Sequence, residues 1–335
     1  MSRMDEKLRN IRAGRYTKKD FMLADAKDND MGGGCTSMGP RRTKDGSANG
    51  FRSRQEYLQE IRTVLKQDIV DIMLVSASNL EVLQNEGLFK GSHVQPAIRA
   101  NDTTDCWGGL RGGNYVSTPS RPFRTANIKR LRESQPNGGT DLGLYSVTFN
   151  NDIDADMRSL EAYAEFRSEA SANGFRHFLE VFNPNAASRL DKEKIPQFVN
   201  DHIVRALAGV MDADRPLFLK MPFNGPEAME ELCSYDSSLV VGVLGGGAGT
   251  TRDTFELLRQ AEKFGARLAL FGRKINMAES PVTMVSTMRR VVDGDLGTEE
   301  AVRFYHSELD KLGMRPTRSL EEDSKITEAP LRKAA

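Results

Sequence analysis

The sequence predicts an α/β protein, a (β/α)8 TIM barrel in which eight strands close a parallel sheet. Eight short apolar segments alternate with segments of helical pattern, as is typical of a parallel sheet covered on both faces. Eight such units fill about 300 residues, which suits a barrel of ~250 residues with insertions. A doubly wound open sheet is the alternative, but closure accounts more simply for eight units.

The expected elements follow one another along the whole chain. The strands cover residues 20–26, 68–76, 94–99, 142–148, 175–182, 217–222, 239–244 and 267–271. Apolar residues at helical spacing, with capping signals, predict helices over 52–66, 79–85, 121–133, 154–172, 193–211, 226–234, 251–264, 281–292 and 297–312. Residues 1–19 are then a polar helical lead-in, 20–312 a single barrel domain, and 313–335 a polar, loosely packed C-terminal tail.

Composition excludes several classes of partner. The chain has 47 basic and 47 acidic residues and no basic stripe with interleaved aromatics, so no nucleic-acid partner is expected. Its three cysteines are far apart and form no CxxC pair, which suits a reducing compartment. No signal-peptide core and no apolar run of the ~20 residues that a membrane span needs are found. We therefore expect a soluble, cytoplasmic protein without a membrane partner.

The sixth strand carries the residue around which the functional hypothesis is built. Lys220 stands between Leu219 and Met221, within FLKMPF. A buried lysine must be paired, must reach water, or must lose its charge. Burial lowers the pKa of a lysine and frees an amine that attacks carbonyl carbons to form a Schiff base. Lys220 is thus a candidate nucleophile; a structural lysine ion-paired inside a strand is the alternative.

Two glycine-containing loops follow the seventh and eighth strands. The first contains Gly245, Gly246 and Gly247, and the second begins with Gly272 and Arg273. Glycines let backbone N–H groups approach an anion, and a following helix directs its positive end there. Barrel phosphate sites are commonly built from these two loops. We therefore predict a phosphate site, against the alternative of a flexible turn and a solvated arginine.

Other polar residues near the strand ends are candidates for proton transfer or binding. Asp25 and Asp28 are candidate acids beside the lysine, and Lys27 is a candidate for a second anionic group. A solvated loop edge is the alternative for the acids, and pairing with these acids is the alternative for Lys27. Glu180, between apolar residues of the fifth strand, should be buried and partnered, either structurally or for catalysis. Tyr145 in the fourth strand is either a core aromatic or an acid.

A metal mechanism is not expected. The four histidines show neither HxH nor HExxH spacing, and sites of carboxylates alone are uncommon for zinc. We therefore predict no metal and no organic cofactor.

The chain resembles the class I, Schiff-base aldolases of the archaeal-type fructose-bisphosphate aldolase group, the DhnA or DeoC/LacD family. The resemblance spans most of the strand order and is strongest over residues 175–292. Lys220 in FLKMPF occupies the place of the family's imine lysine. Gly245 and Gly246, in VLGGGAGTTRDTFELL, match a glycine pair, and LFGRKIN resembles a Gly-Arg-Asn-like phosphate loop.

Two positions depart from the family pattern. The family's first strand usually ends in Asp-His-Gly, whereas ADAKDNDMGGG lacks the histidine, so Asp25 and Asp28 compete for the aspartate. Many members carry a catalytic tyrosine late in the fourth strand. Here the counterpart is Val147 or Thr148, and Tyr145 stands two residues early.

The resemblance implies a carbon–carbon lyase that acts on a phosphorylated sugar or keto compound, without a cofactor, and that associates into a homo-oligomer. Lys220 would attack the substrate carbonyl and the glycine loops would hold the phosphate. Two alternatives stay open: a phosphosugar isomerase or transferase without imine chemistry, and a non-catalytic phosphosugar-binding protein.

Overall fold

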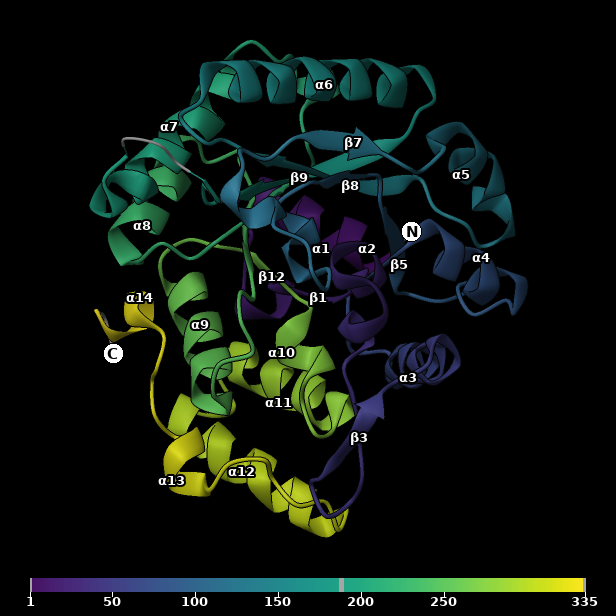
Figure 1. Cartoon of the computed structure of the whole chain (residues 1–335), viewed down its shortest axis with the longest axis vertical. Coiled ribbons are helices and arrows are strands. Elements are labelled where there is room, and N and C mark those ends of the chain that lie inside the picture. Colours follow the sequence, from purple (N-terminus) through teal and green to yellow (C-terminus); the bar gives the residue numbers. More distant parts are fainter. Residues whose placement is uncertain (1, 187–189, 334–335) are drawn as a thin grey trace.

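The computed structural model, which describes residues 2–186 and 190–333, is a closed barrel of eight parallel strands (Figure 1). β12 pairs with β1 and closes the barrel. Each strand overlaps one of the expected ranges, so the predicted fold class is confirmed. In barrel order the strands are β1 (Met22–Lys27), β4 (Ile72–Val75), β5 (Gln95–Arg99), β8 (Leu142–Thr148), β9 (Arg176–Phe182), β10 (Leu219–Met221), β11 (Val241–Leu244) and β12 (Leu268–Phe271).

Helices form a ring around the strands (Figure 1). α12 (Thr298–Lys311) lies outside the ring, against α9 and α11. No helix in the part of the chain that the structure describes is both long and apolar enough to cross a membrane. The ring consists of α3 (Arg54–Gln67), α4 (Ala77–Asn85), α5 (Ile128–Ser134), α6 (Ile153–Ala172), α7 (Ile195–Ala208), α8 (Pro226–Tyr235), α9 (Thr251–Lys263) and α11 (Pro281–Asp293).

Two hydrophobic cores lie on the two sides of the barrel wall. Because side chains alternate along a strand, every second residue faces the interior. Ala24 and Ala26 of β1 belong to the inner core, together with Phe178 of β9 and Phe218, whereas Leu23 belongs to the core between strands and helices. This alternation decides which polar side chains can meet inside the barrel.

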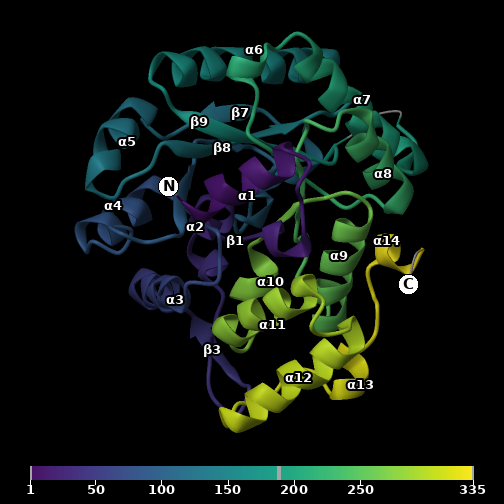
Figure 2. The same cartoon turned by 180° about the vertical axis from the view of Figure 1, so that it is seen from behind.

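The N-terminal helix α1 (Arg3–Arg12) closes the amino end of the barrel (Figure 2). Its Met4 and Leu8 join the inner core. Asp5 accepts a hydrogen bond from Arg176, the first residue of β9, at 2.6 Å. The opposite, carboxyl end is left for the loops that follow the strands.

Two small antiparallel hairpins were not expected. β2 (Pro40–Arg42) pairs with β3 (Ala48–Phe51), and β6 (Asn101–Thr103) pairs with β7 (Pro122–Arg124). The helix expected over 121–133 is therefore wrong in its first half. Residues there pair with β6, and the side chain of Asn127 caps a shorter helix by accepting the N–H of Arg130.

The C-terminal tail is not loosely packed as expected, because it lies along α9. It contains two short helices, α13 (Leu320–Asp323) and α14 (Ala329–Arg332). The side chain of Leu331 is buried, and its carbonyl accepts a hydrogen bond from Gln260 at 2.7 Å. One apolar anchor and backbone carbonyls hold a segment whose composition is otherwise polar.

Candidate active site

Four neighbouring strands each direct one polar side chain into the barrel. Arg99 ends β5, Ser146 lies in β8, Glu180 in β9 and Lys220 in β10. Glu180 is in register with Ser146 on one side and with Lys220 on the other. Glu180 and Lys220 follow the inner-core residues Phe178 and Phe218 by two positions, so they face the same interior.

Lys220 is ion-paired rather than surrounded by apolar groups. Its Nζ lies 2.6 Å from Oε1 of Glu180, and the two residues are 5 % and 1 % exposed. The apolar neighbours Leu219 and Met221 belong to the outer core. The expected apolar surroundings were therefore wrong because neighbours along a strand point to the opposite face. The structure therefore shows an ion-paired lysine, and the pairing is compatible both with a structural role and with catalysis.

Glu180 is the centre of a hydrogen-bond network. Its Oε2 accepts from Oγ of Ser146 at 2.7 Å and from Nη2 of Arg99 at 3.1 Å. Arg99 also donates to Ser146 at 2.8 Å. Asn101 holds the backbone of Ser146 through both its amide atoms, at 2.6 and 2.8 Å. Glu180 is thus buried and partnered, as predicted.

Asp28 reaches the same network from the loop after β1. Its Oδ2 accepts from Nε of Arg99 at 2.5 Å. Burial alone raises the pKa of Asp28, but the positive charges of Arg99 and Lys220 outweigh burial and hold that pKa below its ordinary value. Asp28 is therefore ionised near neutral pH. We call Asp28, Arg99, Ser146, Glu180 and Lys220 the inner cluster.

Asp25 and Lys27 lie on the other face of β1. Ala24 and Ala26 face inward, so Asp25 and Lys27 face the helices. Lys27 lies 3.7 Å from Asp25 and forms an ion pair with Glu60 of α3. Burial raises the pKa of Asp25 to about 6 and lowers the pKa of Lys27 to about 8. The structure does not bring this outer cluster of Asp25, Lys27 and Glu60 to Lys220.

Tyr145 also faces the helical layer. Its ring stacks on Phe166 at 4.5 Å and packs against Tyr163 at 5.1 Å, both on α6. Its hydroxyl is buried without a hydrogen-bond partner among the described residues, and burial raises its pKa well above the ordinary value. The interior position of β8 belongs instead to Ser146.

Sequence reasoning missed Arg99 and Ser146. Arg99 ends a strand that contains Pro96, a residue unfavourable in strands, and Ser146 is next to Tyr145, the candidate acid. The structure shows why both face inward: Arg99 follows Ala97 and Ser146 follows Leu144 of the inner core by two positions.

The loops after β11 and β12 lie side by side because these strands pair. Gly246 has φ +62°, a left-handed conformation that favours glycine, and Gly247 has open space around its Cα. A Cβ on Gly245 would lie 3.2 Å from Phe271, and one on Gly272 would lie 3.0 Å from the carbonyl oxygen of Ala26.

Close backbone packing therefore requires small residues at both loops. Arg273, the first residue of the short helix α10 (Arg273–Asn276), is exposed and forms no ion pair within the described chain.

Two further loops meet at the carboxyl end of the barrel. A Cβ on Gly109, in the loop after β5, would lie 3.1 Å from the Cα of Gly33, in the loop after β1. Thr148, at the end of β8, donates to Asp105 at 2.8 Å. Trp107 packs on Phe123 at 4.8 Å between ring centroids. The long loop after the third barrel strand is therefore ordered and anchored close to the inner cluster.

The described residues contain no group of three or more His, Cys, Asp or Glu side chains that could hold a metal ion. The polar groups of the inner cluster instead bond to one another. The chemistry open to this site is therefore that of an amine, two carboxylates, a guanidinium and a hydroxyl.

Comparison with solved structures relates the chain to Schiff-base aldolases. No protein-family model and no curated protein sequence matches it. An archaeal fructose 1,6-bisphosphate aldolase superposes with a TM-score of 0.60 at 13% identity, over 87% of this chain and 99% of that one. A Schiff-base-forming fructose-1,6-bisphosphate aldolase gives 0.61 at 12%, over 86% and 99%. Cgl0159 from Corynebacterium glutamicum gives 0.58 at 20%, over 88% and 98%.

The fold is thus that of the Schiff-base aldolases, as the family resemblance implied. The likeness covers nearly nine-tenths of the chain rather than one motif. At these identities the likeness defines the architecture alone, because one fold can carry different functions.

Proposed function

We propose that the protein is a class I aldolase that cleaves or forms a carbon–carbon bond of a phosphorylated sugar or keto compound through a Schiff base on Lys220. The observation that carries this proposal is the 2.6 Å contact between Lys220 and Glu180 inside the barrel. An amine and a carboxylate in hydrogen-bond contact, near the carboxyl ends of barrel strands, form a nucleophile–base pair.

Glu180 has the position of the proton acceptor and donor. It takes a proton from the Lys220 ammonium, and the resulting amine attacks the substrate carbonyl carbon to give a carbinolamine. Glu180 returns the proton to the carbinolamine hydroxyl, which leaves as water, and a protonated imine forms. The imine draws electrons from the adjacent carbon–carbon bond, an aldehyde departs, and the enamine is protonated and hydrolysed.

The charges of the inner cluster suit this sequence. Lys220 and Arg99 carry two positive charges, and Glu180 and Asp28 carry two negative charges. A protonated imine has the same charge as the ammonium it replaces, so Glu180 stabilises both. Arg99 and Ser146 fix the Glu180 carboxylate, and Asp28 supplies a second carboxylate on the side of the β1 loop.

The loops after β11 and β12 are the proposed phosphate site. Gly245, Gly246, Gly247 and Gly272 have no side chains to cover their backbone N–H groups, and the exposed Arg273 adds a cation. Lys27 is not part of this site, because it is buried against Glu60. A cytoplasmic location and association into a homo-oligomer belong to the same proposal.

Reductive trapping tests the imine. The protein is incubated with a panel of ketose phosphates and sodium borohydride, and the adduct is mapped by peptide mass spectrometry. An adduct on Lys220, lost in Lys220→Met and kept in Lys311→Met at an exposed lysine, supports the proposal. Turnover without an adduct indicates an isomerase or transferase, and binding without turnover a phosphosugar-binding protein; either result overturns it.

A further inference from the structure

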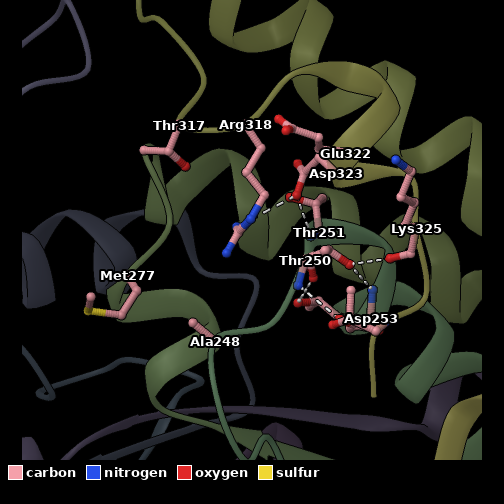
Figure 3. A network of polar contacts seen from close by, with 12 residues as sticks. Ala248, Thr250, Thr251, Asp253, Met277, Thr317, Arg318, Glu322, Asp323 and Lys325 are labelled. Carbon is pink, nitrogen blue, oxygen red and sulfur yellow. Dashed lines mark hydrogen bonds and ion pairs between the residues drawn. The ribbon is translucent and has the colours of Figure 1, made fainter. Parts of the chain in front are cut away.

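A cavity of about 310 Å³ lies between the loop after β11, α10 and the C-terminal segment (Figure 3). Three cationic side chains line it: Arg42 of β2, Lys274 of α10 and Arg318 of the C-terminal segment. Glu279 is the one carboxylate among the described lining residues. It accepts hydrogen bonds from the Thr317 backbone at 2.8 Å and from the Tyr305 hydroxyl at 3.0 Å.

Lys274 is fully buried against a carboxylate from the end of the chain. Its Nζ lies 2.8 Å from Oε1 of Glu328. That oxygen would lie 2.9 Å from a Cβ on Gly249, so the carboxylate rests directly on the loop after β11. Asp253 of α9 holds the segment in place by accepting the backbone N–H groups of Thr327 at 2.7 Å and of Glu328 at 3.2 Å.

A second carboxylate of the same segment occupies the first turn of α9. Oδ1 of Asp323 accepts the backbone N–H of Thr251 at 2.8 Å, and the Lys325 carbonyl accepts from Thr250 at 2.7 Å (Figure 3). Helix N-termini and lysines are groups that bind phosphate in proteins. Beside the glycine loop, side chains of the C-terminal segment bind both groups: Asp323 binds the N-terminus of α9, and Glu328 binds Lys274.

The two arginines keep hydrogen-bond donors for a ligand. Nε of Arg42 is buried and has no partner among the described residues, and its Nη2 makes one long contact of 3.4 Å with the Met277 carbonyl. Arg318 lies 3.8 Å from Asp323, and Figure 3 shows its guanidinium directed toward the space between Met277 and Thr251. A buried donor without a protein acceptor can be satisfied by an acceptor from water or from a ligand, and here it lies in a cavity with two further cations.

We infer that this cavity binds a phosphate monoester through Arg42, Arg318 and Lys274, and that Glu328 leaves Lys274 when the phosphate binds. A phosphate dianion has more charge and more acceptor oxygens than one carboxylate, so it satisfies both arginines and the lysine together. The C-terminal segment is then an internal competitor that weakens binding by holding Lys274. Where the phosphate is that of the substrate, this inference rests on the proposed function.

Calorimetric titration with inorganic phosphate tests the competition. Glu328→Gln should bind phosphate roughly 10-fold more tightly than the unchanged protein, because the competing charge is removed. Lys274→Met and Arg318→Gln should each bind roughly 10-fold more weakly. Glu321→Gln is the matched control, since that glutamate is in the same segment, is 86% exposed and forms an ion pair with Lys325 alone among the described residues. Its affinity should not change.

An unchanged dissociation constant in Glu328→Gln overturns the inference. Unweakened phosphate binding in Arg318→Gln also overturns the inference. The Arg318 side chain is 44% exposed, so this substitution, unlike Lys274→Met, does not disturb a buried side chain. Competition between inorganic phosphate and a ketose phosphate identifies the substrate as the source of the phosphate. Simultaneous binding of the two identifies a separate phosphate ligand.

The same variants keep this inference distinct from the aldolase proposal. Borohydride trapping with dihydroxyacetone, which has no phosphate, should be equal in Glu328→Gln and in the unchanged protein. Tighter phosphate binding without any Lys220 adduct refutes the aldolase and supports the cavity. If Lys220 forms an adduct but Glu328→Gln leaves the phosphate affinity unchanged, the inference about the cavity is refuted and the aldolase proposal is not.

Discussion

Two buried charge clusters lie on opposite faces of the barrel wall. The inner cluster includes Asp28 and Lys220, and the outer cluster includes Asp25 and Lys27. Asp25 and Asp28 are three residues apart in the sequence, yet one faces α3 and the other faces Arg99. Alternation along a single strand therefore decides which of two similar carboxylates joins the candidate nucleophile.

The clusters also differ in how well their charges are satisfied. Asp28 is held by Arg99 at 2.5 Å, and its pKa is lowered. Neither carboxylate oxygen of Asp25 has a hydrogen-bond partner in the described chain, and burial raises its pKa to about 6. The pKa values of these two buried carboxylates therefore shift in opposite directions. Asp28 has a hydrogen-bonded countercharge that outweighs desolvation, whereas the Lys27 amine beside Asp25 lies 3.7 Å away and pairs with Glu60.

The largest effect should come from Lys220→Arg. Arginine keeps the positive charge beside Glu180 but cannot form an imine under these conditions, so kcat should fall by at least ~10⁴-fold. Steady-state kinetics with the substrate identified by trapping, and the melting temperature as a folding check, measure this. Retained turnover in a folded variant would show that the inner cluster is structural.

Glu180→Gln should have the next largest effect. The amide keeps the shape of the side chain but cannot take the lysine proton, so kcat should fall by roughly 10²- to 10⁴-fold, the usual contribution of an acid–base group. The pH profile of kcat/KM should also lose one limb. A normal kcat and a normal pH profile in this variant would show that Glu180 is not the proton-transfer group and would favour Asp28 instead.

Asp25→Asn and Asp28→Asn should change stability in opposite directions. A raised pKa means that Asp25 supports the fold at low pH and opposes it as pH rises from about 4 to about 6. Asp25→Asn should therefore raise the unfolding free energy at pH 7.5 by roughly 2 kcal/mol, with little change near pH 4. Asp28, whose pKa is lowered, supports the fold at high pH, so Asp28→Asn should be destabilising at pH 7.5.

Urea unfolding of both variants at pH 4.5 and pH 7.5 measures these differences. Equal effects of the two substitutions at both pH values would show that the inner and outer clusters do not differ electrostatically.

The smallest effect should come from Tyr145→Phe. Its hydroxyl is buried without a partner, so removing it should change the unfolding free energy by less than about 1 kcal/mol and activity by less than about twofold. Ser146→Ala is the matched change one residue along, and it should lower kcat because Glu180 loses a hydrogen bond. A large loss of activity in Tyr145→Phe alone would contradict the outward placement.

The barrel could be predicted from the sequence because its strands are continuous apolar runs. LGLYSVT and FRHFLEVF each mark one strand regardless of which residues face inward. The face cannot be read from such a run, since both sides are buried. For that reason the sequence found Lys220 and Glu180 but also proposed Asp25, Lys27 and Tyr145, which face the helices.

Contacts between segments far apart in the sequence are the other feature that the sequence does not predict. Arg99 is recognisable only through Asp28 and Glu180, which lie 71 and 81 residues away along the chain. The C-terminal segment looked loose because its composition is polar. The partners of Asp323 and Glu328 are distant in sequence: Thr251 begins α9, and Lys274 lies in α10.

The position of α1 has a consequence for how the molecule is made. The helix is synthesised before its partner, because Arg176, which binds Asp5, follows 171 residues later. At a ribosomal rate of roughly 5–20 residues per second, α1 waits on the order of ten seconds for this partner. Met4 and Leu8 are exposed during that interval, so chaperone binding to the nascent chain should concentrate on its first turns.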